Sequence, residues 1–220
     1  MKTRLFVISL FFLGSLSAQN SRTHTNRAFK RGEVLSYRVH YGLVDAGEAT
    51  VAIAQDSLKF NKSSTFHLVG TGKSRSAFEW FYKVRDRYDS YIDEETLLPH
   101  LFLRRVDEGG FIINQDYKFN QSQNTVNVKR GGSDEARSTP GKQFTVPTST
   151  HDILSAFYYA RNMNLEGVKM GDIITIQTFF DEEVFPMKIK LIGRETLNTR
   201  AGKIRCIKIH PLIQQGRVFK

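Results

Sequence analysis

Cysteine is almost absent from this chain. Cys206 is the only one among 220 residues, so an intrachain disulfide is excluded. Its surroundings, IRCIKI, predict a buried apolar position in a strand rather than a reactive thiol. Beyond the first twenty residues the chain also lacks any apolar run long enough to cross a membrane. Apolar residues make up 40% of the chain and charged residues 25%, which is usual for a soluble globular protein.

The first eighteen residues are predicted to be a signal peptide. Lys2 and Arg4 form a positive start, residues 5–13 are apolar, and the small residues before position 19 suit a signal peptidase. The apolar run is too short to span a bilayer, and no cysteine follows it that could carry a lipid anchor. We therefore expect an exported protein, in the periplasm or outside the cell. Residues 19–31 are predicted to be a flexible lead-in, and residues 32–220 a single β-rich domain.

Recognisable catalytic and metal-binding motifs are also missing. The histidines, at positions 24, 40, 67, 100, 151 and 210, show no paired short spacing, and neither GxSxG nor HExxH occurs. The stretch GTGKS, residues 70–74, lacks the earlier glycine of a phosphate-binding loop and is interpreted as a coincidence at the transition from a strand to a loop. The acidic runs at 93–95 and 181–183 are interpreted as solvated turns. We predict no catalytic residue, no metal and no cofactor.

Apolar and polar residues alternate with period two along most of the chain. The segment VLSYRVHY places Leu35, Tyr37, Val39 and Tyr41 on one face, and similar segments recur as far as IRCIKIH. Turn signals separate these segments, among them Asp45-Ala46-Gly47, Gly109-Gly110, Gly131-Gly132 and Ala201-Gly202. The pattern predicts a mainly β fold of about ten strands, as a curved antiparallel sheet, a roll or an open barrel.

One segment departs from this alternation. STHDILSAFYYARN, residues 149–162, has Ile153, Phe157 and Ala160 on one helical face. Ser149 or Thr150 is expected to cap the start of this helix. A single amphipathic helix needs an apolar surface to lie on, and we expect it to pack on the concave face of the curved sheet.

Aromatic residues next to basic ones indicate where a ligand could bind. FEWFYKVRDRY, residues 78–88, alternates so that Asp86 and Tyr88 face opposite to Arg85 and Arg87. This pattern suits either stacking on a ligand or a strand with core aromatics on one face and charges in water. Export argues against nucleic acid as the partner. Together with the helix and one further strand, the candidate ligand-binding residues are Trp80, Tyr82, Arg104, Phe157, Tyr158 and Arg161.

The stretch YGLVDAGEATV, residues 41–51, could hold an acidic catalytic pair or a hairpin turn. Residues on both sides alternate, and a chain reversal between them needs a residue that tolerates positive φ, which Gly42 or Gly47 supplies. Asp45 is then expected to accept backbone N–H bonds inside the turn. We interpret the stretch as the first hairpin of the sheet.

The order of several segments resembles a known family. These segments are GEVLSYRVHYGLVDAGEATV, FYKVRDRYDSYIDEETLLPHLF, HDILSAFYYARN and LIGRETLNTRAGKIRCIKI. Together they resemble the exported bacterial family of unknown function 3108, from about Gly32 to the C-terminus. The resemblance implies a curved, mainly antiparallel sheet carrying a helix, in the envelope of Gram-negative bacteria, and brings no established catalytic residues. Its members usually continue with another strand pair, so we expect this chain to lack C-terminal strands.

Three functions suit such a protein. The first is non-catalytic binding of a lipid, lipopolysaccharide or other apolar or anionic envelope ligand. Its formal charge of +10, or +8 without the two basic residues of the signal peptide, is compatible with an anionic partner, but the basic residues are more simply explained as solvating the outer faces of strands. The second is a structural or adaptor module that binds another envelope protein through Arg85 and Arg87. The third is a polysaccharide-active hydrolase, for which Asp86 with Glu79 is the best carboxylate pair.

Overall fold

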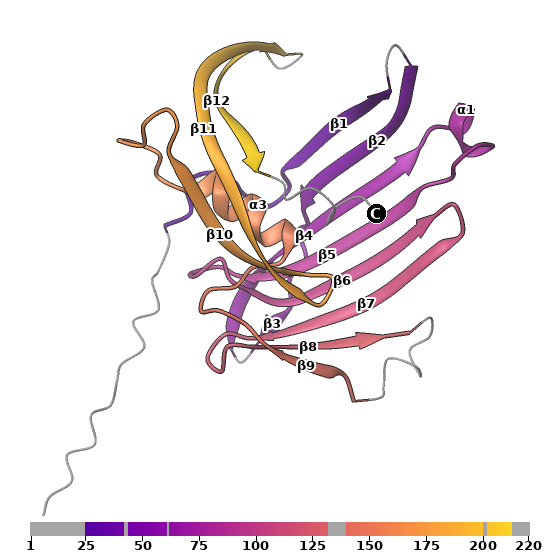
Figure 1. Cartoon of the computed structure of the whole chain (residues 1–220), viewed down its shortest axis with the longest axis vertical. Coiled ribbons are helices and arrows are strands. Elements are labelled where there is room, and N and C mark those ends of the chain that lie inside the picture. The colour runs from indigo at the N-terminus through magenta and orange to yellow at the C-terminus, as the bar shows by residue number, and fades with distance from the viewer. Residues whose placement is uncertain (1–24, 42–43, 61, 132–139, 200–201, 213–220) are drawn as a thin grey trace, which may run out of the picture.

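The computed structural model describes residues 25–41, 44–60, 62–131, 140–199 and 202–212, so the predicted signal peptide lies outside the described residues. Within these ranges two antiparallel sheets are present (Figure 1). The smaller sheet consists of β10 (Ile173–Phe180), β11 (Glu183–Thr199) and β12 (Gly202–Leu212). The strands of the larger sheet are, in spatial order, β1 (Val34–Tyr41), β2 (Val44–Ile53), β4 (Ser63–Ser74), β5 (Arg85–Asp93), β6 (Pro99–Glu108), β7 (Phe111–Asn120), β8 (Thr125–Arg130) and β9 (Lys142–Thr145), with β3 (Lys59–Phe60) paired to β4.

The prediction of a mainly β fold with a curved antiparallel sheet and one amphipathic helix is confirmed. The order of the strands runs from β1 to β9 without returning to β1, so the sheet stays open and is not a closed barrel. The helix is α3 (Ile153–Asn162), and a single further turn, α1 (Ser76–Glu79), lies in the connection between β4 and β5. Within the described ranges no helix is long and apolar enough to span a membrane.

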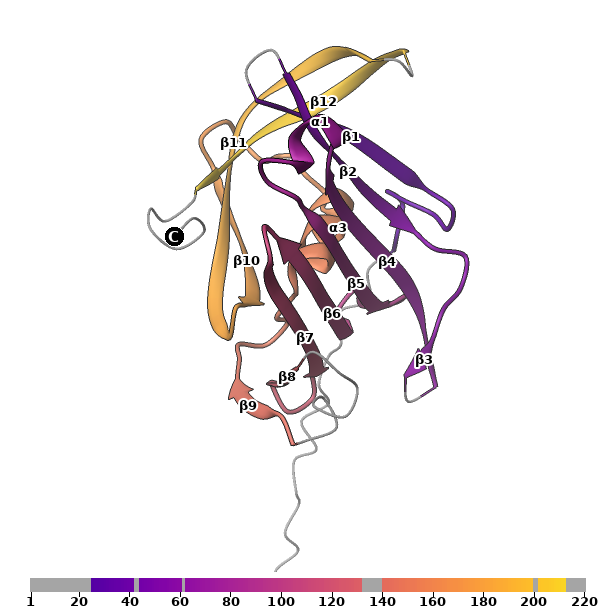
Figure 2. The ribbon, with the colours of Figure 1, turned by 90° about the vertical axis from the view of Figure 1, so that its right-hand side faces the viewer.

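Helix α3 lies on one side of the larger sheet, which we call the inner face, with the smaller sheet beyond it (Figure 2). The helix packs closely on β4, where a Cβ atom added to Gly70 would stand 3.1 Å from Leu154. A second cluster, around Ala156, Ile176 and Ile189, joins the helix to the smaller sheet. Backbone pairing aligns one buried row across six strands beneath the helix, formed by Ile53, Leu68, Ser90, Phe102, Tyr117 and Val128.

The cap of helix α3 is Asp152, not Ser149 or Thr150 as predicted. The Asp152 carboxylate accepts backbone N–H bonds from Leu154 at 2.8 Å and Ser155 at 2.9 Å. The predicted caps fail for local reasons, since Thr150 donates to a backbone carbonyl and Ser149 has a φ of 59°. The hydroxyl of Ser90 on β5 also donates to Asp152, at 2.7 Å, so the cap ties the helix to the sheet.

Replacing Asp152 with alanine is expected to lower the free energy of unfolding by about 2 kcal/mol, because a helix cap and a buried hydrogen bond to Ser90 are lost together. Burial raises the pKa of Asp152 despite its hydrogen bonds. The neutral, similarly shaped asparagine in Asp152→Asn should therefore cost less than about 1 kcal/mol. Urea unfolding of the two variants measures both values, and equal losses would contradict this role of the carboxylate.

Residues 25–33, which include the described part of the predicted lead-in at 19–31, pack against the domain. The ring of Phe29 is buried in the main core, with its centroid 4.9 Å from that of Tyr158 and 5.4 Å from that of Phe66. Arg161 of α3 donates to both carboxylate oxygens of Glu33, at 2.5 and 3.0 Å. The segment therefore closes over one side of the helix.

The first hairpin is confirmed, but of the two glycines proposed for its turn Gly47 does not lie at the reversal, and Gly42 lies outside the described residues. Gly47 and Asp45 lie inside β2, and the chain reverses between Tyr41 and Val44. Gly47 is required because β4 approaches it closely, and not because of a positive φ. A Cβ atom at this position would stand 2.8 Å from the carbonyl oxygen of Lys73. Among the described residues, no backbone N–H donates to the carboxylate of Asp45. Its carboxylate instead pairs with His40 at 2.7 Å and Arg75 at 2.8 Å.

Two further predictions have mixed outcomes. Gly109 and Gly110 have φ values of 59° and 89° in the turn between β6 and β7, as the turn signal predicted. In the signals at 131–132 and 201–202, Gly132 and Ala201 lie outside the described residues. Cys206 does lie in a strand, β12, but it is half-buried rather than buried.

Candidate functional site

The part of the inner face that helix α3 leaves open carries a compact polar cluster. Backbone pairing aligns Tyr88, Arg104, Gln115 and Arg130 on four neighbouring strands, directly beside the buried row. The turn between β10 and β11 approaches this row from the smaller sheet, since Asp181 lies 3.5 Å from Arg104. We call the following residues the inner-face polar cluster: Asp86, Tyr88, Arg104, Glu108, Gln115 and Asp181.

Arg104 is the centre of this cluster. Its guanidinium lies over the ring of Phe180, 4.6 Å from the centroid, and donates to Gln115 Oε1 at 3.3 Å. The Arg104 side chain is only 12% exposed, so its positive charge is largely withdrawn from water. Asp181 is its nearest counter-charge in the described structure, and that carboxylate is itself 66% exposed. An arginine held in this way is suited to bind an anionic group.

Two buried donors of the cluster have no acceptor among the described residues. They are Arg104 Nε and Gln115 Nε2. The amide oxygen of Gln115 is already used, because the hydroxyl of Tyr117 donates to it at 2.6 Å. A buried donor without a partner costs about 1–3 kcal/mol, and native proteins rarely tolerate such groups without a reason. Two such donors side by side are suited to receive an acceptor from a ligand.

The acidic run at 181–183 forms the predicted turn, but its carboxylates are not simply solvated. Asp181 and Glu182 both have positive φ, 52° and 64°, which is unfavourable for residues other than glycine. Asp181 faces Arg104, and Glu182 pairs with Arg130 and, at 3.8 Å, with Lys142. The turn thus places two carboxylates against the cations of the inner face.

Asp86 and Glu108 form a carboxyl pair on the same face. Burial of Asp86, together with its hydrogen bond to Glu108 and the charge of that residue, raises the pKa of Asp86 to about 6. The backbone N–H of Asp107 and the charge of Arg104 act in the opposite direction but do not offset this. Asp86 therefore changes its charge close to neutral pH, beside the arginine that would hold an anion.

Replacing Asp86 with asparagine is expected to raise stability above pH 7 by about 1–2 kcal/mol. The raised pKa of Asp86 means that the folded protein favours the protonated form. Native Asp86 therefore loses stability as the pH rises through about 6, and the variant does not. Thermal unfolding from pH 5 to pH 8 measures the difference, which should shrink toward pH 5. A constant difference over this range would contradict the assigned pKa.

Next to the polar cluster the inner face is lined by small residues. Tyr37, Ala49, Gly72 and Asp86 are aligned across β1, β2, β4 and β5, so two strands without bulky side chains lie between Tyr37 and Asp86. Tyr37 is 46% exposed and Val39, on the same face of β1, is 49% exposed. This part of the inner face is therefore apolar and open to solvent.

The six predicted ligand-binding residues do not lie together. Phe157, Tyr158 and Arg161 form one group on α3, where the Arg161 guanidinium lies 5.1 Å from the centroid of Tyr158 and 5.7 Å from that of Phe157. Burial raises the pKa of Tyr158 to about 12, and its hydroxyl has no partner among the described residues. Arg104 belongs to the inner-face polar cluster, four strands from β1.

Trp80 and Tyr82 lie far from that helix, in the connection between β4 and β5 (Figure 1). Gly70 contacts the helix, and α1 begins six residues later, at Ser76. At about 3.3 Å per residue of extended chain, this separation is roughly 20 Å. Trp80 is 84% exposed and Tyr82 48%. Trp80 therefore does not lie with the predicted binding residues on α3.

The carboxylate pair suggested for a hydrolase is not assembled. Glu79 pairs with Arg85, whose side of β5 is opposite to that of Asp86. The partner of Asp86 is Glu108, which sequence reasoning missed. The two residues are brought together by the pairing of Val84 with Glu108, which connects segments more than twenty residues apart. No group of three or more potential metal ligands occurs among the described residues.

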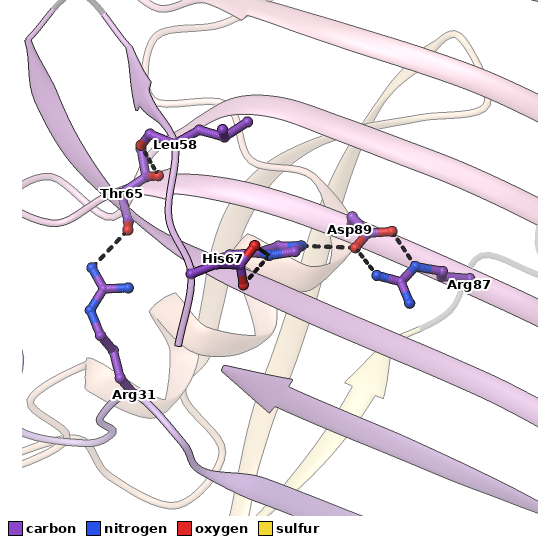
Figure 3. Close-up of polar contacts among 7 residues, drawn as sticks. Arg31, Leu58, Thr65, His67, Arg87 and Asp89 are labelled. Carbon is purple, nitrogen blue, oxygen red and sulfur yellow. Dashed lines mark hydrogen bonds and ion pairs between the residues drawn. The ribbon is translucent and has the colours of Figure 1, made fainter. Parts of the chain in front are cut away.

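The outer face of the sheet carries a second charged network (Figure 3). His67 Nε2 lies 2.8 Å from Asp89 Oδ1, and the guanidinium of Arg87 donates to both oxygens of Asp89, at 2.7 and 2.8 Å. His67 Nδ1 contacts Asp56 at 3.1 Å, and its ring stacks on Tyr91 at 4.3 Å. Because His67 is 5% exposed and enclosed by these partners, the network is suited to stabilise the sheet rather than to bind a ligand.

A hollow of about 560 Å³ lies at the β1–β2 hairpin. Its lining is Ser36, Tyr37, Arg38, Glu48, Ala49 and Thr50, of which most are polar. The paired residues Arg38 and Glu48 belong to the outer face, on the opposite side from Val51 and the core. The outer side of the hollow is therefore charged and does not suit an acyl chain, whereas Tyr37 and Ala49 belong to the inner face.

These features define a class of protein: an open, curved antiparallel sheet whose inner face carries a helix and an arginine-centred polar cluster. A family model described as "Protein of unknown function (DUF3108)" matches residues 36–220, and the chain belongs to this family. The resemblance inferred from the order of the motifs is thereby confirmed. The comparisons with curated proteins and with solved structures gave no match.

Proposed function

We propose that the chain is an exported, non-catalytic binding protein of the bacterial envelope whose inner face holds a ligand with an apolar body and an anionic head group. A fatty acid or a phospholipid has this chemistry. The observation that carries the proposal is the pair of buried donors without acceptors among the described residues, Arg104 Nε and Gln115 Nε2, beside a strip of the inner face that is apolar and open.

The head group is assigned to the position of the Asp181 carboxylate. Asp181 is exposed and lies at the long distance of 3.5 Å from Arg104, so a carboxylate or phosphate from solution could replace it at small cost. Such a group would also offer acceptors to Arg104 Nε and Gln115 Nε2. A charge-assisted hydrogen bond to a largely buried arginine contributes about 1.5–3 kcal/mol.

The apolar body is assigned to the strip of small residues next to the cluster. Ala49 and Gly72 leave room above the sheet, and Tyr37 and Val39 provide half-exposed apolar surface beside them. The smaller sheet provides further apolar surface. Its Ile209 is paired with the buried Leu191 and lies on the same face of β12 as Ile207, and the two isoleucines are 44% and 43% exposed. Burial of such surface against an acyl chain contributes about 25 cal/mol per Å².

The carboxyl pair of Asp86 and Glu108 does not support the alternative of a polysaccharide hydrolase. Glycoside hydrolysis needs two carboxyl groups about 5 Å apart or more, with the sugar between them. Asp86 and Glu108 instead share a hydrogen bond. The pair is better suited to adjust the affinity for an anion, since ionised Asp86 would repel a head group at Arg104.

Native mass spectrometry of delipidated protein tests the proposal. The protein is mixed with palmitate, with phosphatidylglycerol and, as a control without an anionic head group, with the corresponding fatty alcohol. We expect one bound palmitate or phosphatidylglycerol per chain and at least about tenfold weaker binding of the alcohol, because the alcohol lacks the charge that Arg104 binds. Failure to retain either anionic lipid would refute the proposal.

A further inference from the structure

Two neighbouring loops at one end of the larger sheet expose five large apolar side chains. The connection between β4 and β5 exposes Trp80 to 84%, Phe81 to 74% and Tyr82 to 48%. The turn between β6 and β7 exposes Phe111 to 66% and Ile112 to 65%. Both connections lie at the right-hand end of the sheet in Figure 1. We call these five residues the aromatic tip.

The two loops of the aromatic tip are joined to each other. The backbone N–H of Gly109 donates to the carbonyl of Lys83 at 2.8 Å, and Val84 forms a bridge with Glu108. The ring of Tyr82 lies so close to Gly109 that an added Cβ atom would stand 2.7 Å from it. The apolar side chains are thus presented by a connected pair of loops.

We propose that the aromatic tip docks on the surface of a lipid bilayer that contains anionic lipids. Tryptophan, tyrosine and phenylalanine at exposed loop tips are typical of membrane interfaces, where their rings lie at the level of the head groups. Lys83 stands at the base of the tip and is exposed, and so are three cations that pair with carboxylates there: Lys73 with Glu48, Arg75 with Asp45, and Arg85 with Glu79. Without Lys2 and Arg4 of the predicted signal peptide the chain carries a formal charge of +8, from the +10 of the full sequence, which attracts it to an anionic surface.

The size and shape of the tip argue against a second protein chain as the occupant. A stable interface between two proteins buries about 800 Å² on each partner and uses about 20–30 residues a side. The aromatic tip consists of five side chains on two turns. Insertion of a few side chains into the interface of a bilayer requires no matching shape, so a tip of this size is sufficient. This inference does not depend on the proposed ligand site, which lies on the inner face.

Trp80 is the only tryptophan of the chain, so its fluorescence reports on the tip alone. The purified protein is titrated with vesicles of phosphatidylethanolamine and phosphatidylglycerol, and in parallel with vesicles of phosphatidylcholine. We expect the anionic vesicles to shift the Trp80 emission to shorter wavelengths and to reduce its quenching by acrylamide. The effect should weaken at high salt, because the attraction to the surface is partly electrostatic.

Variants separate docking by the tip from general adsorption. The double variant Phe81→Ser, Phe111→Ser is expected to lower partitioning into the anionic vesicles at least about tenfold, since it removes two of the apolar side chains that would be buried in the bilayer. Met170→Ser is the matched control, because Met170 is 72% exposed but lies between α3 and β10. It should change partitioning less than about twofold.

Three outcomes would overturn the inference. The first is an unchanged Trp80 emission with anionic vesicles, and the second is an equal loss of partitioning in the Met170 variant. The third is protection of Trp80 from acrylamide without vesicles, increasing with protein concentration, which would assign the tip to contact between two copies of the chain. Circular dichroism of each variant confirms that folding is retained before partitioning is compared.

Discussion

Asparagine in place of Asp89 is expected to lower the free energy of unfolding by about 2–4 kcal/mol, one of the largest effects of any single substitution in this protein. The side chains of Asp89 and His67 are 8% and 7% exposed, and Arg87 depends on Asp89 for both of its bonds within this network. The variant leaves a nearly buried imidazole facing an amide and an arginine without its counter-charge. Urea unfolding at several pH values measures the loss.

The loss should depend on pH in a defined direction. Burial alone would lower the pKa of His67, but hydrogen bonds to Asp89 and Asp56 raise it above its ordinary value of 6.5. Burial alone would raise the pKa of Asp89, but hydrogen bonds from His67 and Arg87 lower it below 3.8. Because the pKa of His67 is raised, protonated His67 stabilises the fold below about pH 6.5, and this contribution is lost as the pH rises. Because the pKa of Asp89 is lowered, ionised Asp89 stabilises the fold above about pH 4, and this contribution is lost as the pH falls.

The cost of Asp89→Asn should therefore be largest between about pH 4 and pH 6.5 and smaller at pH 9. Asp56→Asn is the matched control, because Asp56 contacts the other nitrogen of the same imidazole but is 72% exposed. Its cost should stay below about 1 kcal/mol. Equal costs for the two variants, or a cost of Asp89→Asn that does not change with pH, would show that the network is not held by the charge of Asp89.

Glutamine in place of Arg104 is expected to weaken the binding of palmitate by about 10–100-fold, since a charge-assisted bond to a mostly buried arginine is lost. Arg105→Gln provides an unusually close control. Arg105 is the next residue along β6, but its side chain is on the outer face, where it pairs with Asp116 at 2.6 Å. Its replacement should leave the affinity for palmitate unchanged, and isothermal titration calorimetry measures both variants.

Asp181→Asn should act in the opposite direction. If the Asp181 carboxylate occupies the position of the head group, its neutral replacement should strengthen palmitate binding several-fold, because the ligand no longer competes with an internal anion. Equal affinities for the Arg104 and Arg105 variants would remove Arg104 from the site. A weaker affinity for the Asp181 variant would place the head group elsewhere.

The fold could be predicted from the sequence to a large extent because its signals are local. Strict alternation in VLSYRVHY and its counterparts determines which residues share a face, and the structure pairs Leu35 with Val51 and Tyr37 with Ala49 as this alternation requires. The same is true of Asp86 and Tyr88, which face opposite to Arg85 and Arg87. Of the two glycines proposed for the first turn, Gly47 was wrong, because it looks like a turn residue but is required by the close approach of β4, and Gly42 lies outside the described residues.

The candidate site could not be predicted because it depends on pairings between distant segments. Asp86 meets Glu108 only through the register of β5 and β6, and Arg104 meets Asp181 only where the smaller sheet approaches the larger one. Arg104 was identified as a candidate, but neither carboxylate partner is near it in the sequence. Conversely, Trp80 and Phe157 both suggested binding because they are aromatic, and the curved sheet separates them along the length of β4.

Photo-crosslinking with a fatty acid tests the central claim most directly, since it shows where the ligand lies. A palmitate analogue with a diazirine in its chain is bound to the delipidated protein and irradiated, and the modified peptides are identified by mass spectrometry. We predict crosslinks to inner-face residues around Tyr37, Ala49 and Tyr88, and their loss in Arg104→Gln but not in Arg105→Gln. Crosslinks confined to the outer face of the sheet or to the aromatic tip would contradict a ligand site on the inner face.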